Sequence, residues 1–220
     1  MTFPQKLIDG YGAFAAGRLR IEQDRYRELA ETGQRPEIML IGCCDSRCAP
    51  EAIFNARPGE LFVVRNIGNI VPPYAPDAQA HGVSAALEFG VMALKVKHIV
   101  VLGHAQCGGV QAFAEDAAPL TPSDFIGHWM SLMAPAAKRV GPRGSMTHAE
   151  YIGALERASV LNSLDNLKTF PRIAKLIEKG DLTTHGAYFG VATGDLSVLD
   201  KTSGKFMPVA RDRTDAAPKF

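Results

Sequence analysis

The sequence predicts an α/β fold with a mainly parallel central sheet flanked by helices. Short apolar runs at residues 38–44, 61–66 and 98–104 are separated by segments with helical spacing. Each run is apolar at consecutive positions, which is typical of parallel strands that are covered on both faces. The 220 residues are enough for one large domain, and no linker or internal repeat divides them. We therefore expect a single domain over residues 1–220.

An N-terminal helical arm is expected ahead of the first strand. Residues 1–33 carry apolar side chains at helical spacing and predict one or two amphipathic helices that end near Gly33. Such an arm packs either on its own domain or on another subunit.

The later segments predict further helices and a C-terminal strand or hairpin. A hairpin or edge strand is expected over residues 187–200, and a polar, flexible tail over residues 205–220. Helical patterns occur at residues 49–55, 81–94, 122–140 and 148–179, and another helix is expected to open at Gly108.

Composition excludes several functional classes. The chain has 24 basic and 23 acidic residues, a net charge of +1, so it offers no electrostatic footprint for nucleic acid. No apolar run approaches the roughly 20 residues of a membrane span, and the N-terminus lacks the features of a signal peptide. We expect a cytoplasmic protein with no nucleic-acid or membrane partner. Four cysteines are too few for a disulfide scaffold and are expected to be free thiols or metal ligands.

Candidate metal ligands follow two of the predicted strands. Cys43 and Asp45 end the first strand, and His104 ends the third, with Cys107 shortly after it. Ligands bind beyond the carboxyl ends of parallel strands, and side chains two positions apart face the same way. Thiolate and imidazole donors suit zinc, and three protein ligands leave one position open, as in catalytic sites.

Neighbouring residues support this chemistry. Cys107 is expected at a helix N-terminus, which favours the thiolate, and Gly108 and Gly109 allow close approach of the backbone. An arginine can hold a carboxylate by two hydrogen bonds. Arg47 would thus keep Asp45 ionised and able to accept a hydrogen bond from a metal-bound water.

Two motifs resemble those of the β-class carbonic anhydrases. CCDSR (43–47) is similar to the Cys-x-Asp-Ser-Arg motif of that family, and GHAQCGG (103–109) to its Gly-His-x-x-Cys-Gly-Gly motif. The resemblance extends from about residue 34 to 140, and more weakly to residue 200. The segment PGELFVVRNIGNIVPPY (58–74) resembles the plant-like branch in particular.

This resemblance implies a function and a ligand set. Cys43, His104 and Cys107 would bind one Zn²⁺ per chain, and Asp45 with Arg47 would form a catalytic dyad. The implied reaction is the reversible hydration of carbon dioxide to bicarbonate and a proton, by attack of zinc-bound hydroxide. The family also implies a homodimer, extended in some members to a tetramer or octamer, in which the N-terminal helices embrace the partner.

Departures from the family pattern predict an open site. Some members close when the dyad aspartate moves onto zinc, with bicarbonate in a pocket of Trp, Arg and Tyr. The corresponding positions here are Leu40, Arg65 and Phe189, so two of the three pocket residues differ. We therefore expect water as the fourth ligand at neutral pH, while Arg65 can equally anchor a loop or an interface.

The resemblance also suggests residues of the substrate cleft. Gln34 matches a glutamine of the plant-like branch, and Phe89 occupies the position of a cleft tyrosine. An apolar wall that admits carbon dioxide would include Phe62, Ile67 and Phe89, partly from a neighbouring subunit, with Gly108 beside the ligands.

Other interpretations remain open. The same zinc site can hydrolyse carbonyl sulfide or carbon disulfide. A non-catalytic zinc or iron–sulfur module would use Cys43, Cys44, Cys48 and Cys107, although adjacent strand residues face opposite ways. We expect Cys44 and Cys48 to be small buried residues. No functional role is expected for the remaining histidines, namely His81, His98, His128, His148 and His185.

Overall fold

A computed structural model describes residues 2–77 and 79–210 of the chain. The described residues divide into two compact units, one of residues 36–209 and one that contains residues 2–35. In the part of the chain that is described, none of the helices combines the length and the apolar character that a bilayer crossing requires.

The N-terminal unit contains two helices, α1 (Gln5–Ala16) and α2 (Arg18–Thr32). The ring of Phe14 packs edge-on against that of Tyr26, with 6.1 Å between the centroids, and so joins the two helices. Gly33 ends α2 in the left-handed region, with φ of 79°, which a glycine adopts without a steric penalty. One or two helices that end near Gly33 were expected, and the structure has two. No side chain of α1 is buried.

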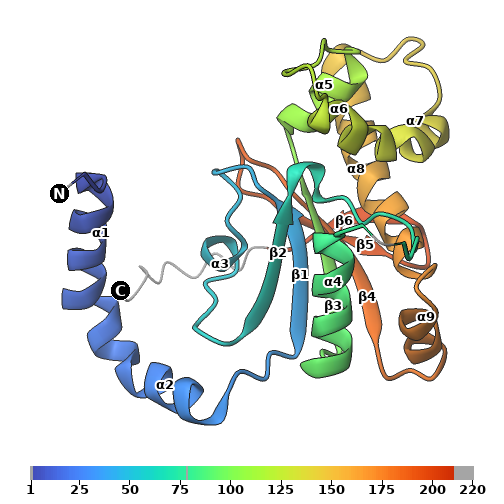
Figure 1. Cartoon of the computed structure of the whole chain (residues 1–220). Coiled ribbons are helices and arrows are strands. Elements are labelled where there is room, and N and C mark those ends of the chain that lie inside the picture. Colours follow the sequence, from blue (N-terminus) through green and yellow to red (C-terminus); the bar gives the residue numbers. More distant parts are fainter. Residues whose placement is uncertain (1, 78, 211–220) are drawn as a thin grey trace. The chain divides into compact units, whose positions relative to one another are not determined.

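The larger unit is built on a six-stranded sheet in the order β2-β1-β3-β4-β5-β6 (Figure 1). Strands β2, β1, β3 and β4 are parallel, and β5 and β6 continue the sheet antiparallel to β4. The predicted fold class is therefore confirmed. The strands are β1 Ile38–Cys43, β2 Leu61–Asn66, β3 His98–His104, β4 Thr183–Phe189, β5 Leu196–Asp200 and β6 Lys205–Pro208.

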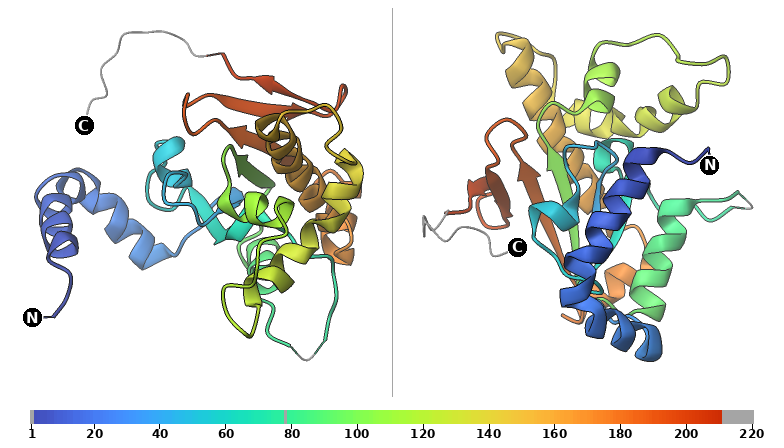
Figure 2. Two further views of the ribbon diagram at one scale, coloured as in Figure 1. Left: turned by 90° about the horizontal axis from the view of Figure 1, so that it is seen from above. Right: turned by 90° about the vertical axis from the view of Figure 1, so that its left-hand side faces the viewer.

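Strand register brings the chemistry-bearing residues to one edge of the sheet. Gly42 of β1 pairs with Leu102 of β3, so the last residues of these strands, Cys43 and His104, lie at the same carboxyl edge. Figure 1 shows α5, α6 and α7 grouped beyond this edge, and the right-hand view of Figure 2 shows the same group at the top.

Proline positions divide two of the expected helices. The pattern over residues 148–179 forms two helices, α8 and α9, because Pro171 opens α9 and cannot continue α8. The pattern over 122–140 likewise forms three short segments, the last with Pro135 in its first turn. The helices are α3 Pro50–Ile53, α4 Gly82–Glu88, α5 Gly108–Ala114, α6 Phe125–Met130, α7 Ala134–Val140, α8 His148–Leu167 and α9 Pro171–Glu178, with 3₁₀ turns at Ile67–Asn69 and Ser131–Met133.

Helix α4 continues directly into a π-helical turn, Phe89–Ala93. The i→i+5 hydrogen bond that defines this turn runs from the N–H of Leu94 to the carbonyl of Phe89, at 3.0 Å. A Cβ at Gly90 would lie 2.9 Å from the Met39 sulfur, so only glycine lets this turn approach β1 so closely. The turn therefore packs α4 tightly onto the sheet.

Two of the three apolar clusters in the described residues pack against the sheet and around the site. The first packs β1 and β3 against α8 and α9, and includes Met39, Ile41, Ile99, Val101, Val160 and Leu167. The second lies beyond the carboxyl edge and includes Cys43 and Cys107 with Ile70, Val110, Met130 and Leu155. The candidate ligands are therefore part of a packed interior and not of a surface loop.

The prediction of a flexible tail from residue 205 is wrong for its first residues, which form a strand. β6 (Lys205–Pro208) pairs antiparallel with β5, and the ring of Phe206 packs against that of Tyr188 at 6.3 Å. One partly buried aromatic side chain and the pairing with β5 hold this short segment, yet its sequence gives too little pattern to predict a strand. Residues 211–220 lie outside the described part of the chain.

The packing of β3 against α8 can be tested at Gly103. A Cβ at this position would lie 2.6 Å from Cγ2 of Val160, so Gly103→Ala should overpack the core. We expect the free energy of unfolding to fall by about 1–3 kcal/mol, measured by urea denaturation. Gly82→Ala is the control, because a Cβ there meets nothing within 4 Å, and it should change stability by less than about 0.5 kcal/mol. Equal effects in the two variants would contradict this account of the packing.

Candidate metal centre

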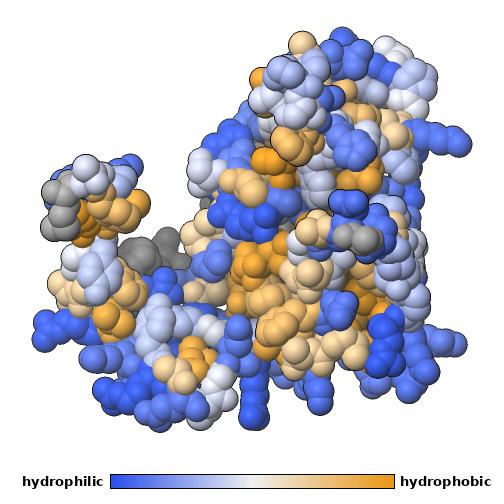
Figure 3. Space-filling view, in the orientation of Figure 1, coloured by the Kyte–Doolittle hydropathy of each residue, from blue (hydrophilic) through white to orange (hydrophobic). Residues whose placement is uncertain are grey.

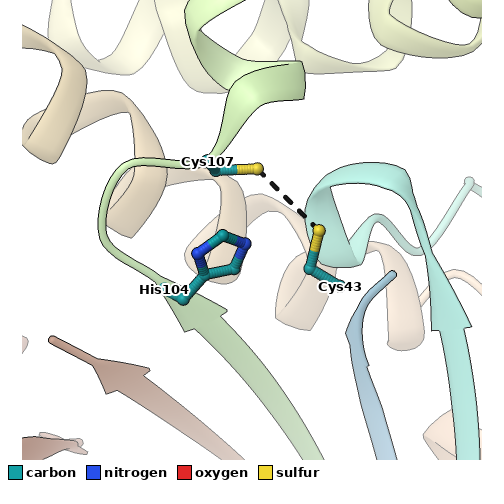
Figure 4. A group of neighbouring side chains, drawn as sticks. All are labelled: Cys43, His104 and Cys107. Atoms are coloured by element: carbon teal, nitrogen blue, oxygen red, sulfur yellow. Dashed lines mark hydrogen bonds between the residues drawn. The ribbon is translucent and has the colours of Figure 1, made fainter. Parts of the chain in front are cut away.

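Three predicted ligands meet at the carboxyl edge of the sheet. Cys43 is the last residue of β1, His104 is the last residue of β3, and Cys107 precedes α5 (Figure 4). Their ligand atoms all lie within 4.8 Å of one another, and the two sulfurs are 3.9 Å apart. Among the described residues, this is the one group of three or more Cys, His or acidic side chains so arranged.

The hydrogen bonding of His104 leaves one ring nitrogen free to bind a metal. Its Nδ1 donates a hydrogen bond of 2.9 Å to the carbonyl of Ala105, which leaves Nε2 as the nitrogen with a free lone pair. Nε2 is buried and has no hydrogen-bond partner, and the whole residue is 1% exposed. An unpartnered buried polar atom costs about 1–3 kcal/mol, so its orientation toward two thiols fits a bound metal.

The two thiols compete for one proton when no cation is bound. A hydrogen bond from Cys107 lowers the pKa of Cys43, and the same contact raises the pKa of Cys107. The N–H of Gly68 also points at the Cys43 sulfur, at 3.4 Å. A divalent cation would favour both thiolates at once. Two sulfurs and one imidazole nitrogen are the donor set that zinc prefers, so these residues fit the metal that the sequence predicts.

Asp45 and Arg47 form a bidentate pair beside this group. Arg47 Nε donates to Oδ1 at 2.9 Å and Nη2 donates to Oδ2 at 2.7 Å. The hydrogen bonds from Arg47 hold the pKa of Asp45 well below its usual range. Asp45 therefore stays a hydrogen-bond acceptor at every pH near neutrality, as the resemblance implies for the dyad.

Arg65 anchors the loop that follows β1. It donates to the carbonyls of Cys43 at 2.8 Å and of Asp45 at 2.7 Å, and so fixes the backbone on both sides of Cys44. Leu40 and Phe189 pack in an apolar cluster. In family members that close, these three positions form the bicarbonate pocket. Here two of them are apolar residues, and the third is an arginine that already binds two backbone carbonyls.

Ile67 and Gly108 lie next to the metal ligands. Cγ2 of Ile67 would be 2.6 Å from a Cβ at Gly109, so Ile67 packs against the start of α5. The indole of Trp129 donates to the Ile67 carbonyl at 2.8 Å and holds this segment in place. A Cβ at Gly108 would meet nothing within 4 Å, so open space adjoins the residue after Cys107.

The other predicted cleft residues do not join the centre within this unit. Phe62 packs on Phe89 with 5.9 Å between the centroids, but it pairs with Met39, four positions before Cys43. At roughly 3.3 Å per residue this is about 13 Å along the strand. Phe89 directly follows α4 and is 51% exposed. Figure 3 shows apolar side chains gathered in the middle of the face that it draws. Gln34 belongs to the N-terminal unit.

The remaining cysteines lie outside the group. The prediction that Cys44 is buried is wrong, because it follows the end of β1 and its side chain is exposed. Cys48 is buried as expected, and burial raises its pKa to about 11. This arrangement does not bring four cysteines together, as a zinc or iron–sulfur module would require.

Three residues near the centre were not predicted from the sequence to have a role there. Glu156 of α8 is 3% exposed and accepts a hydrogen bond from the backbone of Cys107. Gln106 has a left-handed backbone, with φ of 59°, and Trp129 binds the Ile67 carbonyl. Glu156 stands directly before Arg157 in α8, as many exposed helix residues do, and its burial is visible only in the folded chain.

Comparison with known proteins accounts for both the fold and this centre. The family model "Carbonic anhydrase" matches residues 38–196, which include every candidate ligand and the Asp45–Arg47 pair. A carbonic anhydrase of Pseudomonas aeruginosa is 37% identical over 93% of this chain and 91% of its own length. The chain therefore belongs to the carbonic anhydrases, and the structural matches identify the β class.

Solved structures show the same architecture. The β-carbonic anhydrase CcaA superimposes with a TM-score of 0.87 and 30% identity, over 94% of this chain and 92% of its own. A structure described as one of two tetrameric β-carbonic anhydrases from Sordaria macrospora gives a TM-score of 0.77 and 28% identity, over 94% and 98% of the two chains. Assignment to the plant-like branch stays a prediction.

Metal content distinguishes a Cys₂His centre from a four-cysteine module. Cys107→Ala should lose stoichiometric zinc, measured by atomic absorption on the purified protein, because it removes one of three ligands. Cys48→Ala is a matched control, since both thiols are 2% exposed, and it should keep one zinc per chain. Zinc retained by the first variant, or lost by the second, would contradict the ligand assignment.

Proposed function

We propose that this chain catalyses the reversible hydration of carbon dioxide to bicarbonate and a proton, with one Zn²⁺ held by Cys43, His104 and Cys107. The observation that carries the proposal is the buried, unpartnered Nε2 of His104, which lies within 4.8 Å of two thiols. Membership of the family supports the reaction class, and the donor set supports zinc.

The chemistry is divided between the metal and the dyad. Zinc bound by these residues would lower the pKa of a coordinated water to about 7, and so supply hydroxide at neutral pH. Asp45 is held ionised by Arg47 and can only accept a hydrogen bond. It would therefore orient an O–H at the centre and leave an oxygen lone pair directed at carbon dioxide.

The immediate surroundings suit a small apolar substrate. Ile67 supplies an aliphatic wall against the start of α5, and the space beside Gly108 is open. Carbon dioxide needs little more than an apolar approach. We assign Ile67 and Gly108 to this part of the cleft.

An open site at neutral pH is part of the proposal. Both carboxylate oxygens of Asp45 are bound by Arg47, and Arg65 is engaged with the carbonyls of Cys43 and Asp45. Movement of Asp45 onto the metal would break the first set of bonds. Leu40 and Phe189 offer no polar group that would stabilise bicarbonate in a closed state.

We further propose a homodimer as the working unit. Helix α1 buries none of its side chains, and Leu7 and Tyr11 are 57% and 67% exposed. β2 is an edge strand, and Phe89 beside it is half exposed. Phe62, Phe89 and Gln34 would then line the cleft of the partner subunit. The tetrameric Sordaria proteins are a precedent for larger assemblies, and a cytoplasmic location stays a prediction.

Stopped-flow carbon dioxide hydration by the zinc-loaded protein tests the reaction and the open site together. We expect zinc-dependent turnover from about pH 6.5 to about pH 9, still substantial near pH 7.5, because the nucleophile ionises near neutrality. An abrupt loss below about pH 8, deepened by bicarbonate, would contradict the open site. Sulfide release from carbonyl sulfide or carbon disulfide, with no hydration of carbon dioxide, would favour the alternative substrates.

The role of the dyad can be separated from that of the metal. Asp45→Asn should retain zinc and lose about 10²–10⁴-fold in turnover. An amide can donate as well as accept a hydrogen bond, so it no longer fixes the orientation of the O–H at the centre. Asp165→Asn is a matched control, since Asp165 forms a 2.7 Å pair with Arg139 on the surface, as Asp45 does with Arg47. Full activity of Asp45→Asn would exclude the proposed role.

A further inference from the structure

The peptide unit that joins Gln106 to Cys107 is held at both ends by charged side chains. Its carbonyl accepts a hydrogen bond of 3.0 Å from Nη2 of Arg47, and its N–H donates one of 2.9 Å to Oε1 of Glu156. Arg47 comes from the loop after β1, and Glu156 comes from the middle of α8. Two distant segments therefore fix one peptide plane in the loop between two metal ligands.

This loop needs external support because its backbone is strained. Gln106 has φ of 59°, a left-handed conformation that costs a non-glycine residue about 1–2 kcal/mol. A rotation of the following peptide would change ψ of Gln106 and φ of Cys107. The sulfur of Cys107 would then turn away from Cys43 and His104.

Glu156 is placed where a carboxylate is costly unless it is fully bonded. It is 3% exposed, and its second oxygen accepts a hydrogen bond of 2.6 Å from the hydroxyl of Tyr188. The guanidinium of Arg157 lies 4.0 Å from the centre of the Tyr188 ring and covers it. A buried charged group costs several kcal/mol unless it is hydrogen-bonded, and here both carboxylate oxygens of Glu156 have a donor.

Helix α8 also supports the other sulfur ligand. One turn along from Glu156, the hydroxyl of Ser159 donates to the carbonyl of Gly68 at 3.3 Å. The N–H of Gly68 in turn points at the Cys43 sulfur at 3.4 Å. One face of α8 thus contacts the backbone beside both thiols, through Glu156 for Cys107 and through Ser159 for Cys43.

We propose that Glu156 is a positioning residue of the metal centre. It holds the Gln106–Cys107 peptide in one orientation against Arg47, and so keeps the Cys107 thiolate in reach of the metal. Arg47 also binds Asp45. The same hydrogen bonds therefore fix the position of Asp45 relative to the loop that carries Cys107. This inference rests on the proposed zinc centre, but it concerns how tightly and in what geometry the metal is held, and not which substrate is turned over.

The first test compares metal release from the full-length parent protein with that from Glu156→Met and Tyr188→Phe. Methionine fills a similar volume but cannot accept the Cys107 N–H, so zinc transfer to a chelator should become about 10–100-fold faster. Tyr188→Phe breaks only the second bond of Glu156 and should release zinc at close to the parental rate. Thermal unfolding of both variants measures their general loss of stability, which a purely structural role would alter without changing release.

The geometry of the centre gives a second readout. In the cobalt-substituted protein, the thiolate charge-transfer and d–d absorption bands should change in Glu156→Met and stay as in the parent in Tyr188→Phe. Parental release and an unchanged cobalt spectrum in Glu156→Met would overturn the proposal, even if carbon dioxide hydration were established. A parent that binds zinc but does not hydrate carbon dioxide would instead refute the proposed function and leave this test intact.

A conservative variant covers the case in which Glu156→Met does not fold. Glu156→Gln keeps an acceptor oxygen and removes the charge, so its bond to Cys107 should weaken and zinc release should rise only several-fold. The Cys107 amide proton, observed by NMR, should shift upfield and exchange faster with solvent than in the parent. An unchanged amide resonance in Glu156→Gln would show that this bond does not hold the loop.

Discussion

A buried imidazole nitrogen that faces two thiols is the constraint on which this site depends. The protein itself supplies no hydrogen bond to Nε2 of His104, and it cannot ionise Cys43 and Cys107 together without a nearby positive charge. The fold brings these three groups together although Nε2 is left without a partner and the two thiols oppose each other's ionisation. Neighbouring features such as the Ala105 carbonyl and the Gly68 N–H set the direction of the donors. The folded chain therefore supplies the orientation of the candidate ligands.

The arrangement also separates rigid from adjustable parts. Cys43 and His104 end strands that pair along their length, so the sheet determines their separation. Cys107 lies in a loop with one strained residue and depends on contacts from Arg47 and α8. Two ligands are thus placed by regular secondary structure, and the third is placed by side chains that arrive from elsewhere in the chain.

The sequence was sufficient for the parts of the site that follow from local pattern. Apolar runs locate the ends of β1 and β3, and the residue types at those ends indicate the metal, so Cys43, His104 and Cys107 could be named in advance. Arg47 and Asp45 lie close enough in sequence for their pairing to be expected. The fold class follows from the same strands.

Other features depend on contacts between distant segments. Glu156 matters because of a backbone N–H that is far away in the sequence, and no local pattern marks a partner of that kind. β6 is ordered by the packing of one ring, Phe206 on Tyr188. Cys44 is exposed because the chain leaves the sheet directly after Cys43. Whether Phe62 and Phe89 line a cleft depends on a second subunit, which a single chain cannot specify.

The π-helical turn after α4 has a consequence for how this chain tolerates insertions and deletions. Such a turn holds one residue more than an α-helical turn, so it absorbs an added residue without lengthening the helix. The connection between β2 and β3 therefore holds one extra residue at Phe89–Ala93, while each of these strands keeps its register with β1. Since the pairing of β1 with β3 places Cys43 and His104, the spacing of these candidate donors does not depend on that extra residue.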